Sequence, residues 1–224
     1  MDLTETLVDL YEALRRAYGY RNWWPGDGPF EVMAGAILTQ RTNWGNVEKA
    51  LDALKEKDAL NPERMARMAP EDLQDLVRPA GYYRQKSARL QRLCRWLLDR
   101  CGGRVAELER VPTDELREEL LAIRGIGPET ADSMLLYALD RLTFVVDTYT
   151  TRIVVRHGLL DAGAGYYELK DLFEAHLPQE LDLYRDYHAQ LVELGKRRCR
   201  PTPKCRGCPA RPVLGEPLEA EELL

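Results

Sequence analysis

Residues 113–139 read TDELREELLAIRGIGPETADSMLLYAL, and this stretch decides the fold. Apolar residues recur at helical spacing on both sides of residues 124–127, and Pro128 stands where proline favours the start of a second helix. Glycine permits a sharp turn, and the first N–H groups of a helix have no partners within it. The stretch therefore predicts two helices whose turn can bind a DNA phosphate, although a turn of this kind alone is also typical of an ordinary helix–turn–helix corner.

The rest of the chain has the same helical spacing, and strand-like alternation is nearly absent. Glycine and proline interrupt the series, so we expect about ten helices joined by short connections. The predicted fold class is all-α, with two helical lobes and a cleft between them. One lobe takes residues 25–135 and the other combines 1–24 with 136–214, while residues 215–224 form an acidic tail.

Composition narrows the function classes. Of 224 residues, 45% are hydrophobic and 31% are charged, and no apolar run approaches the roughly 20 residues that span a membrane. The chain starts without a basic leader or the apolar centre of a secretory signal. We therefore expect a cytoplasmic monomer without a membrane partner, associated with the nucleoid when it binds DNA.

The net charge of −5 hides two basic segments. Residues 196–211 hold seven Lys or Arg and no acid, and residues 82–96 hold five and no acid. Such segments can bind phosphates on an acidic protein, and they are equally typical of solvated faces.

The five cysteines fall into two groups. Cys94 and Cys101 lie in a helical stretch and are expected to be small buried hydrophobes. Cys199, Cys205 and Cys208 crowd together, which in a reducing compartment indicates a metal rather than disulfides. Zinc is disfavoured because no histidine stands near them in the sequence to complete a tetrahedron.

A second motif follows the hairpin. Residues 144–153 read FVVDTYTTRI, and Asp147 ends an apolar run where a helix would begin, as a capping residue does. Together with the hairpin, this motif resembles the helix–hairpin–helix DNA glycosylase superfamily of the endonuclease III type. The resemblance continues through GYYRQKSARL (81–90) and ILTQRT (37–42), so it covers nearly the whole chain.

The resemblance implies a site residue by residue. It makes Asp147 the catalytic carboxylate and double-stranded DNA with damaged bases the partner. It places Gln40 near the wedge that fills the vacated base stack. Lys196, which ends the helix before the cysteines, is expected to contact a phosphate. The residues that it implies for the phosphate-binding hairpin are Gly125, Ile126, Gly127 and Thr130.

Endonuclease III carries a lysine two residues after the second hairpin glycine, and this sequence has Glu129 there. A carboxylate cannot form the imine that leads to strand cleavage, so we expect a monofunctional enzyme. Asp147 would stabilise oxocarbenium character at C1′ and position or deprotonate a water, which leaves an abasic site.

Three tryptophans, Trp23, Trp24 and Trp44, stand where the superfamily builds its base pocket. The arrangement WWPxxxxF followed by TQxTxW looks like the 3-methyladenine branch. An aromatic pocket suits a cationic alkylated purine through cation–π attraction. The same residues are also typical of a core or a lobe interface, and Trp96 is expected in the core.

The spacing Cys199-x5-Cys205-x2-Cys208 is similar to the iron–sulfur loop of endonuclease III, here over residues 199–214. The resemblance implies a structural 4Fe–4S cluster, which four thiolates usually hold. The fourth position is Leu214, so the fourth ligand is not identified.

Three other functions stay open. A related enzyme could remove oxidised pyrimidines or mismatched thymine or uracil. A non-catalytic DNA-damage-binding protein could keep the hairpin, although Asp147 argues against it. A metal-dependent nuclease would need more acidic ligands than Asp147 and Glu129.

Overall fold

The computed structural model describes residues 2–218, and within that range it contains helices and no strand. The predicted all-α class is therefore confirmed. The predicted acidic tail lies, from residue 219 on, outside the described residues. No helix in the described range is long and apolar enough to cross a membrane. In chain order the elements are α1 (Leu3–Tyr18), α2 (Pro29–Leu38), α3 (Trp44–Glu56), α4 (Pro62–Arg67), α5 (Pro70–Val77), η1 (Arg78–Ala80), α6 (Tyr83–Cys101), η2 (Val105–Arg110), α7 (Thr113–Ala122), α8 (Pro128–Ala138), α9 (Thr148–Arg156), α10 (Tyr166–His176), α11 (Leu181–Arg197) and α12 (Arg211–Leu214), where η marks a 3₁₀ helix.

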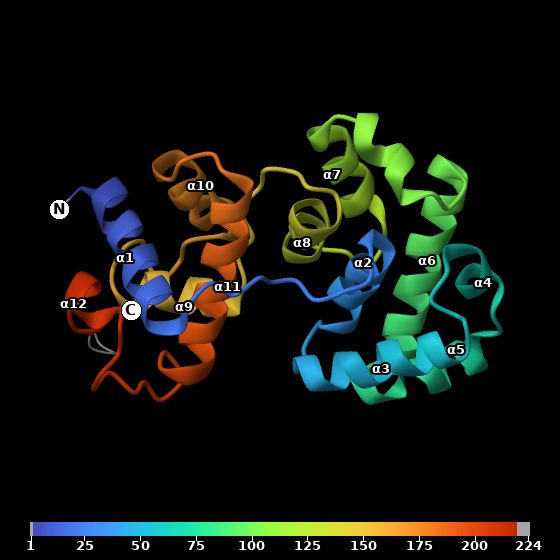
Figure 1. The fold of residues 1–224 in the computed structure, drawn as a ribbon, viewed down its shortest axis with the longest axis horizontal. Helices are drawn as coiled ribbons and strands as arrows, with labels where there is room; N and C mark the ends of the chain where they lie inside the picture. Colours follow the sequence, from blue (N-terminus) through green and yellow to red (C-terminus); the bar gives the residue numbers. More distant parts are fainter. Residues whose placement is uncertain (1, 219–224) are drawn as a thin grey trace. The chain divides into compact units, whose positions relative to one another are not determined.

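The chain forms two compact units (Figure 1). The first unit joins both ends of the chain, Met1–Trp23 and Leu142–Leu224, and the second is the continuous segment Trp24–Arg141. The boundaries between the two lobes predicted from the sequence lie after residues 24 and 135.

The second unit is built around α6, which packs against α2, α4 and α5. Leu90, Leu93 and Leu97 are fully buried, and their spacing places them along one face of this helix. Cys94 and Cys101 are buried beside them, as expected. Gly102, in the left-handed conformation, ends the helix with N–H donations back to it.

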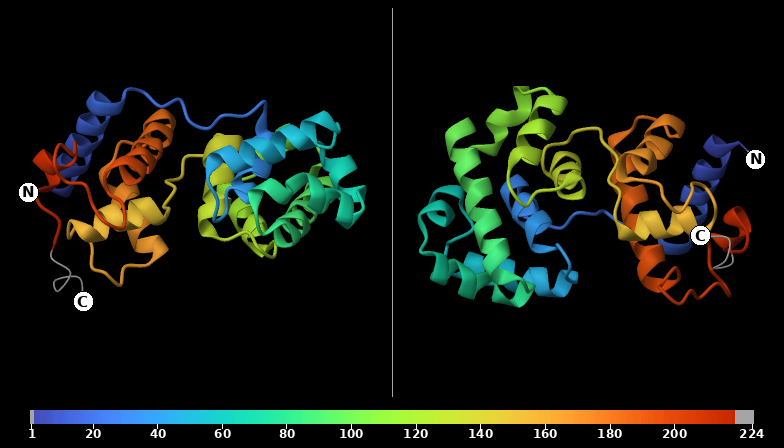
Figure 2. Two further views of the ribbon diagram at one scale, coloured as in Figure 1. Left: turned by 90° about the horizontal axis from the view of Figure 1, so that it is seen from below. Right: turned by 180° about the vertical axis from the view of Figure 1, so that it is seen from behind.

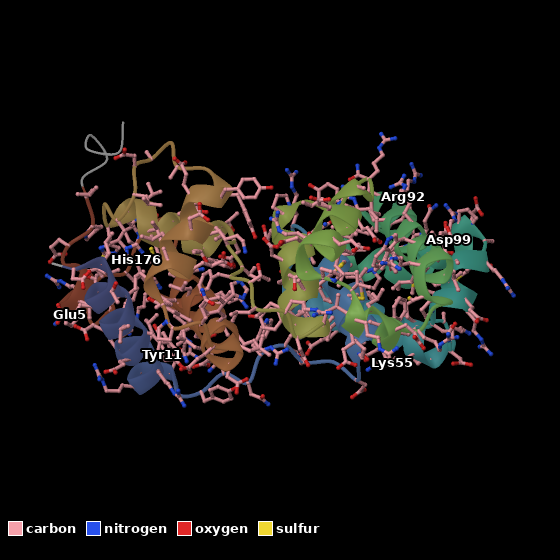
Figure 3. The ribbon with its side chains drawn as sticks, turned by 90° about the horizontal axis from the view of Figure 1, so that it is seen from above. Glu5, Tyr11, Lys55, Arg92, Asp99 and His176 are labelled. Carbon is pink, nitrogen blue, oxygen red and sulfur yellow. The ribbon has the colours of Figure 1, made fainter. Side chains whose placement is uncertain are left out.

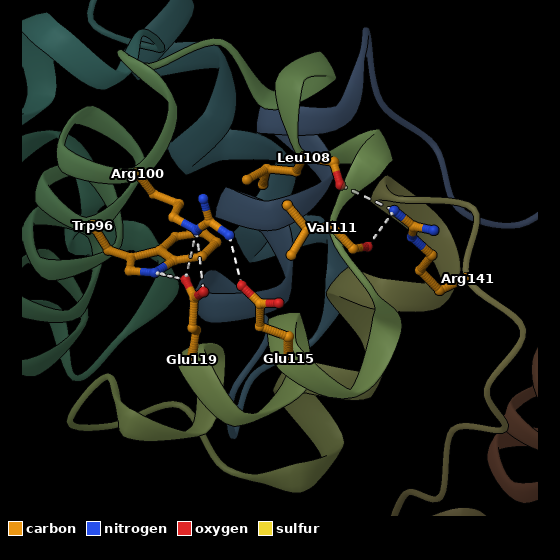
Figure 4. Close-up of polar contacts among 7 residues, drawn as sticks. All are labelled: Trp96, Arg100, Leu108, Val111, Glu115, Glu119 and Arg141. Atoms are coloured by element: carbon orange, nitrogen blue, oxygen red, sulfur yellow. Dashed lines mark hydrogen bonds and ion pairs between the residues drawn. The ribbon is translucent and has the colours of Figure 1, made fainter.

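Polar contacts fix α6 to α7 (Figure 4). Trp96 packs its ring against the core while Nε1 donates to Glu119 Oε2 over 2.8 Å. Arg100 donates to the same carboxylate and, over 2.8 Å, to Glu115 Oε1. Trp96 is half-buried and packs on the core rather than lying within it, and its indole N–H is satisfied by an acid on the neighbouring helix.

The first unit packs α1 against α10, α11 and α12, and α9 against α11. Figure 2 shows the first helix (blue) beside the last helix (red) in this unit. Phe144 and Phe173 stack with ring centres 4.2 Å apart, and the fully buried Tyr187 donates to Leu7 O over 2.8 Å. Tyr11, labelled in Figure 3, donates to the buried Asp186 over 2.9 Å. The start of the chain is therefore held to α11 by apolar packing and by paired buried polar groups.

Candidate functional site

The turn between α7 and α8 requires glycine at Gly125. Its φ is +101°, and a Cβ there would lie 2.6 Å from Arg89 Nε. Ile126 is only 4% exposed, and its N–H donates to Ile123 O over 3.0 Å. The apolar residue of the turn thus anchors the loop to the core of its unit.

The second helix of the hairpin begins as the sequence predicts. Gly127 is the N-cap of α8 in extended backbone, and Pro128 is the first helical residue. Glu129 is exposed in the first turn, whereas Thr130 is 7% exposed. The start of α8 therefore presents a carboxylate to solvent at the position where endonuclease III carries its lysine.

Side chains from α6 and from the end of α2 hold the turn in place. Gln40 Nε2 donates to Gly125 O over 3.2 Å and to Thr130 Oγ1 over 2.9 Å. Arg89 Nη1 donates to Gln40 Oε1, and Arg92, labelled in Figure 3, donates to Arg124 O over 3.0 Å. Gln40 is thus a structural brace of the hairpin, and a role for it at DNA remains a proposal.

Lys86 corrects the expectation of a basic surface over residues 82–96. Its side chain is 1% exposed, and Nζ donates to Leu38 O over 2.8 Å and to Ala80 O over 2.6 Å. Burial lowers the pKa of its amine to about 8. The prediction is wrong at this residue because two backbone carbonyls inside the unit need its donors.

A bidentate ion pair, missed in the sequence, joins the two helices of the hairpin. Arg117 Nε lies 2.7 Å from Asp132 Oδ1, and Nη2 lies 3.1 Å from Oδ2. Asp132 is fully buried. A buried carboxylate needs such a partner, so the pair fixes α8 against α7.

Asp147 is the N-cap of α9, as its sequence position predicts. Its Oδ1 accepts from the N–H of Thr150 over 2.7 Å and from Thr150 Oγ1 over 2.9 Å. Its Oδ2 lies 3.9 Å from Nε2 of His188, a 5% exposed residue of α11. Burial lowers the pKa of His188 although Asp147 opposes the shift. The carboxylate therefore has one oxygen fixed by the cap and the other beside a buried imidazole.

Two of the predicted pocket tryptophans come together. The Trp24 and Trp44 rings meet edge to face with centres 5.4 Å apart, and Tyr137 lies 5.3 Å from Trp24. The three side chains form an aromatic cluster. Gly35 leaves room for it, because a Cβ on Gly35 would lie only 3.3 Å from Trp24 Nε1. Tyr137 could not be found from the sequence, because its position depends on α8 packing against α2.

Trp23 has a cation as its neighbour. Lys196 Nζ, at the exposed end of α11, lies 5.6 Å from the centre of the Trp23 ring. This distance is within the range of cation–π attraction. The structure thus brings together Trp23 and the predicted phosphate-contacting lysine in the first unit.

The cysteine loop is tied to α9 by two arginines. Arg152 Nη1 donates to Cys199 O over 2.8 Å, and Arg156 Nη1 donates to Arg200 O over 2.7 Å. Arg156 Nη1 also lies 3.4 Å from the sulfur of Cys199, whose thiol pKa is raised by burial. The loop is therefore positioned by donors to its backbone.

The three loop cysteines line one narrow pocket. His157, at the end of α9, lines the same pocket. A histidine therefore lies near the cysteines in the fold, although none is near them along the sequence. Within residues 2–218, no three His, Cys, Asp or Glu side chains are already arranged around a single metal position.

A glycine hairpin followed by a carboxylate at the start of the next helix defines a class of helical DNA-repair proteins. A family model described as "HhH-GPD superfamily base excision DNA repair protein" matches residues 34–179. The chain belongs to this superfamily, whose glycosylases act on N-glycosyl bonds of DNA.

The chain is also similar to individual DNA-repair proteins. MJ1434 of Methanocaldococcus jannaschii, whose name proposes a DNA repair glycosylase, is 43% identical over 92% of this chain and 94% of its own. Endonuclease III of Thermotoga maritima is 36% identical over 80% of this chain and 79% of its own. The H. pylori 3-methyladenine DNA glycosylase MagIII, solved with 1,N6-ethenoadenine, superposes with a TM-score of 0.76 and 30% identity over 88% of this chain and 98% of that one. An endonuclease III–DNA covalent intermediate shares the fold, with a TM-score of 0.80 and 24% identity over 95% of both chains.

Proposed function

We propose that this protein is a monofunctional DNA glycosylase that flips an alkylated purine, such as 3-methyladenine, out of duplex DNA and leaves an abasic site. The observation that carries the proposal is Asp147, a carboxylate with Oδ1 fixed by the cap of α9 and Oδ2 beside His188. A carboxylate held in this way can stabilise positive charge that develops on the sugar without reorganising during the reaction.

The proposed reaction follows from these groups. Base flipping removes the target from the stack, which is easiest for a damaged base. As the C1′–N bond breaks, Asp147 stabilises the oxocarbenium character of the sugar and orients or deprotonates the attacking water. Gly125, Ile126, Gly127 and Thr130 would hold a phosphate of the same strand at the start of α8.

The absence of strand cleavage is proposed from Glu129. Its carboxylate is exposed in the first turn of α8. It cannot form a Schiff base with C1′, so the reaction would stop at hydrolysis. Separate measurement of base release and strand breakage tests this point.

The proposed preference for alkylated purines rests on the aromatic cluster of Trp24, Trp44 and Tyr137. A cationic methylated base is attracted to aromatic faces by roughly 0.5–2 kcal/mol per contact. Its positive charge already activates the glycosidic bond, so a general acid is not needed. The similarity to MagIII supports the same class of substrate.

A second candidate is the removal of oxidised pyrimidines. It is favoured by the 36% identity to an endonuclease III over four-fifths of this chain. We also propose that the loop at residues 199–214 holds a structural 4Fe–4S cluster, because Cys199, Cys205 and Cys208 line one pocket.

The test compares wild type, Asp147→Asn and Asp161→Asn on duplexes that contain 3-methyladenine or thymine glycol. Asparagine also caps helices, so Asp147→Asn should keep the thermal stability of the wild type. We expect it to lower base release by roughly 10²–10⁴-fold. Asp161, exposed in the same unit, is the matched control and should be neutral.

Release of 3-methyladenine without strand breakage would support the proposal. Faster release of thymine glycol would favour the second candidate. A borohydride-trapped adduct would show that another amine performs lyase chemistry. No base release from either duplex would favour a DNA-damage-binding protein.

A further inference from the structure

We propose that His157 is the fourth ligand of the metal group held by Cys199, Cys205 and Cys208. The inference rests on the iron–sulfur cluster proposed above and names the ligand that the sequence does not supply. Leu214, at the position of the fourth cysteine in endonuclease III-type loops, has no donor atom in its side chain. Another residue must complete a four-ligand set.

His157 has the position that this role requires. It lines the pocket shared by the three cysteines, although it ends a helix far from them in sequence. It also lies close to the backbone of Leu214, the position of the missing cysteine. Its Nδ1 atom is buried without a hydrogen-bond partner.

An unpartnered buried ring nitrogen costs free energy unless something binds it. A neutral imidazole can coordinate a metal through Nδ1 as well as through Nε2. Three thiolates and one imidazole are a known donor set for zinc, and imidazole replaces thiolate on iron in Rieske clusters.

The surroundings suit a negatively charged group. Arg156 lies 3.4 Å from the Cys199 sulfur, and Arg198, Lys204 and Arg211 line the same pocket. These cations can offset the charge of the thiolates. Because no three His, Cys, Asp or Glu side chains of residues 2–218 surround one metal position, the proposal requires the loop to close around the metal when it binds.

The experiment measures iron, zinc and sulfide per chain in anaerobically purified wild type and in His157→Ala, His157→Cys and His176→Ala. His176, labelled in Figure 3, bonds to Leu172 O on α10 and is the matched histidine control. The rate at which a chelator removes the metal is recorded for each protein. Pulsed EPR of the reduced wild type detects a bound nitrogen even if a variant fails to fold.

We expect His157→Ala to lose metal roughly 10–100-fold faster, while His157→Cys and His176→Ala retain it. Nitrogen hyperfine coupling in the wild type would support the assignment directly. One zinc per chain that depends on His157 would support the ligand and overturn the iron–sulfur cluster. An iron–sulfur wild type without nitrogen coupling and with unchanged release in His157→Ala would overturn the ligand alone. A wild type without metal would overturn both and leave the glycosylase proposal to its own test.

Discussion

Lys86 is almost entirely buried, and its amine has a structural role. Its amine joins the end of α2 to the end of η1 through two carbonyl acceptors. Removal of the amine leaves both carbonyls buried without that donor, which costs roughly 1–3 kcal/mol per group. The residue type alone suggested a surface contact, but burial reverses this interpretation.

We predict that Lys86→Met lowers the free energy of unfolding by about 2–3 kcal/mol near pH 7. The exposed Lys49→Met is the control and should change it little. Chemical denaturation measures both. Equal stability of the two variants would contradict a bracing role for Lys86.

The same residue predicts a pH dependence. The pKa of its amine falls from an ordinary 10.5 to about 8 in the folded protein. Between these values the unfolded chain binds more protons, so the stability of the wild type should rise relative to Lys86→Met as the pH increases from about 8 to 10.5. A difference that stays constant over this range would mean that the amine titrates normally in the folded protein.

At the scale of elements, the hairpin depends on its first glycine more than on its second. Gly125 has φ of +101° and no room for a Cβ, whereas Gly127 has φ of −100° and no atom within 4 Å of an added Cβ. Gly125 is therefore required by the conformation of the turn, whereas at Gly127 a side chain would be excluded only by a bound ligand.

We predict that Gly125→Ala lowers the free energy of unfolding by about 1–3 kcal/mol, through left-handed strain and displacement of Arg89. Gly127→Ala should fold nearly as stably and bind duplex DNA more weakly, because its Cβ would obstruct a phosphate. Thermal unfolding and fluorescence anisotropy measure the two effects. The idea fails if both variants unfold alike.

The hairpin and the cap were predictable because their signals are local. Gly125, Gly127 and Pro128 specify a turn and a helix start over a few residues, and Asp147 specifies the next start. Contacts between distant residues were not predictable. Periodicity cannot show that Asp132 pairs with Arg117 or that His157 meets the cysteines, because helix packing brings these residues together.

At the scale of the whole molecule, net charge is a poor guide to a partner. The chain carries −5, yet its basic residues gather over 196–211, where Lys196 and Arg206 are exposed. Any phosphate contacts there would release counterions and make binding depend on salt.

We predict that Lys196→Ala and Arg206→Ala each weaken binding to undamaged duplex DNA and reduce the slope of log K against log[salt] by about 0.9 per lost phosphate contact. Arg16→Ala, on α1, serves as the control because Arg16 pairs with Glu12 on the same helix. Titrations at several salt concentrations give the slopes. Slopes identical to the wild type would place the DNA elsewhere.

The first unit combines a segment that precedes the second unit with one that follows it, so the two units are completed at different times during biosynthesis. On the ribosome, the second unit is complete in sequence once residue 141 has emerged, and it can fold during translation. By contrast, α1 is made before the second unit, yet its partner α11 is made after it. The apolar face of α1, with Leu7, Leu10 and Leu14, therefore lacks its native cover until residues 181–197 have been made. Apolar surface that stays exposed during this interval is prone to aggregation and is the kind of surface that chaperones protect.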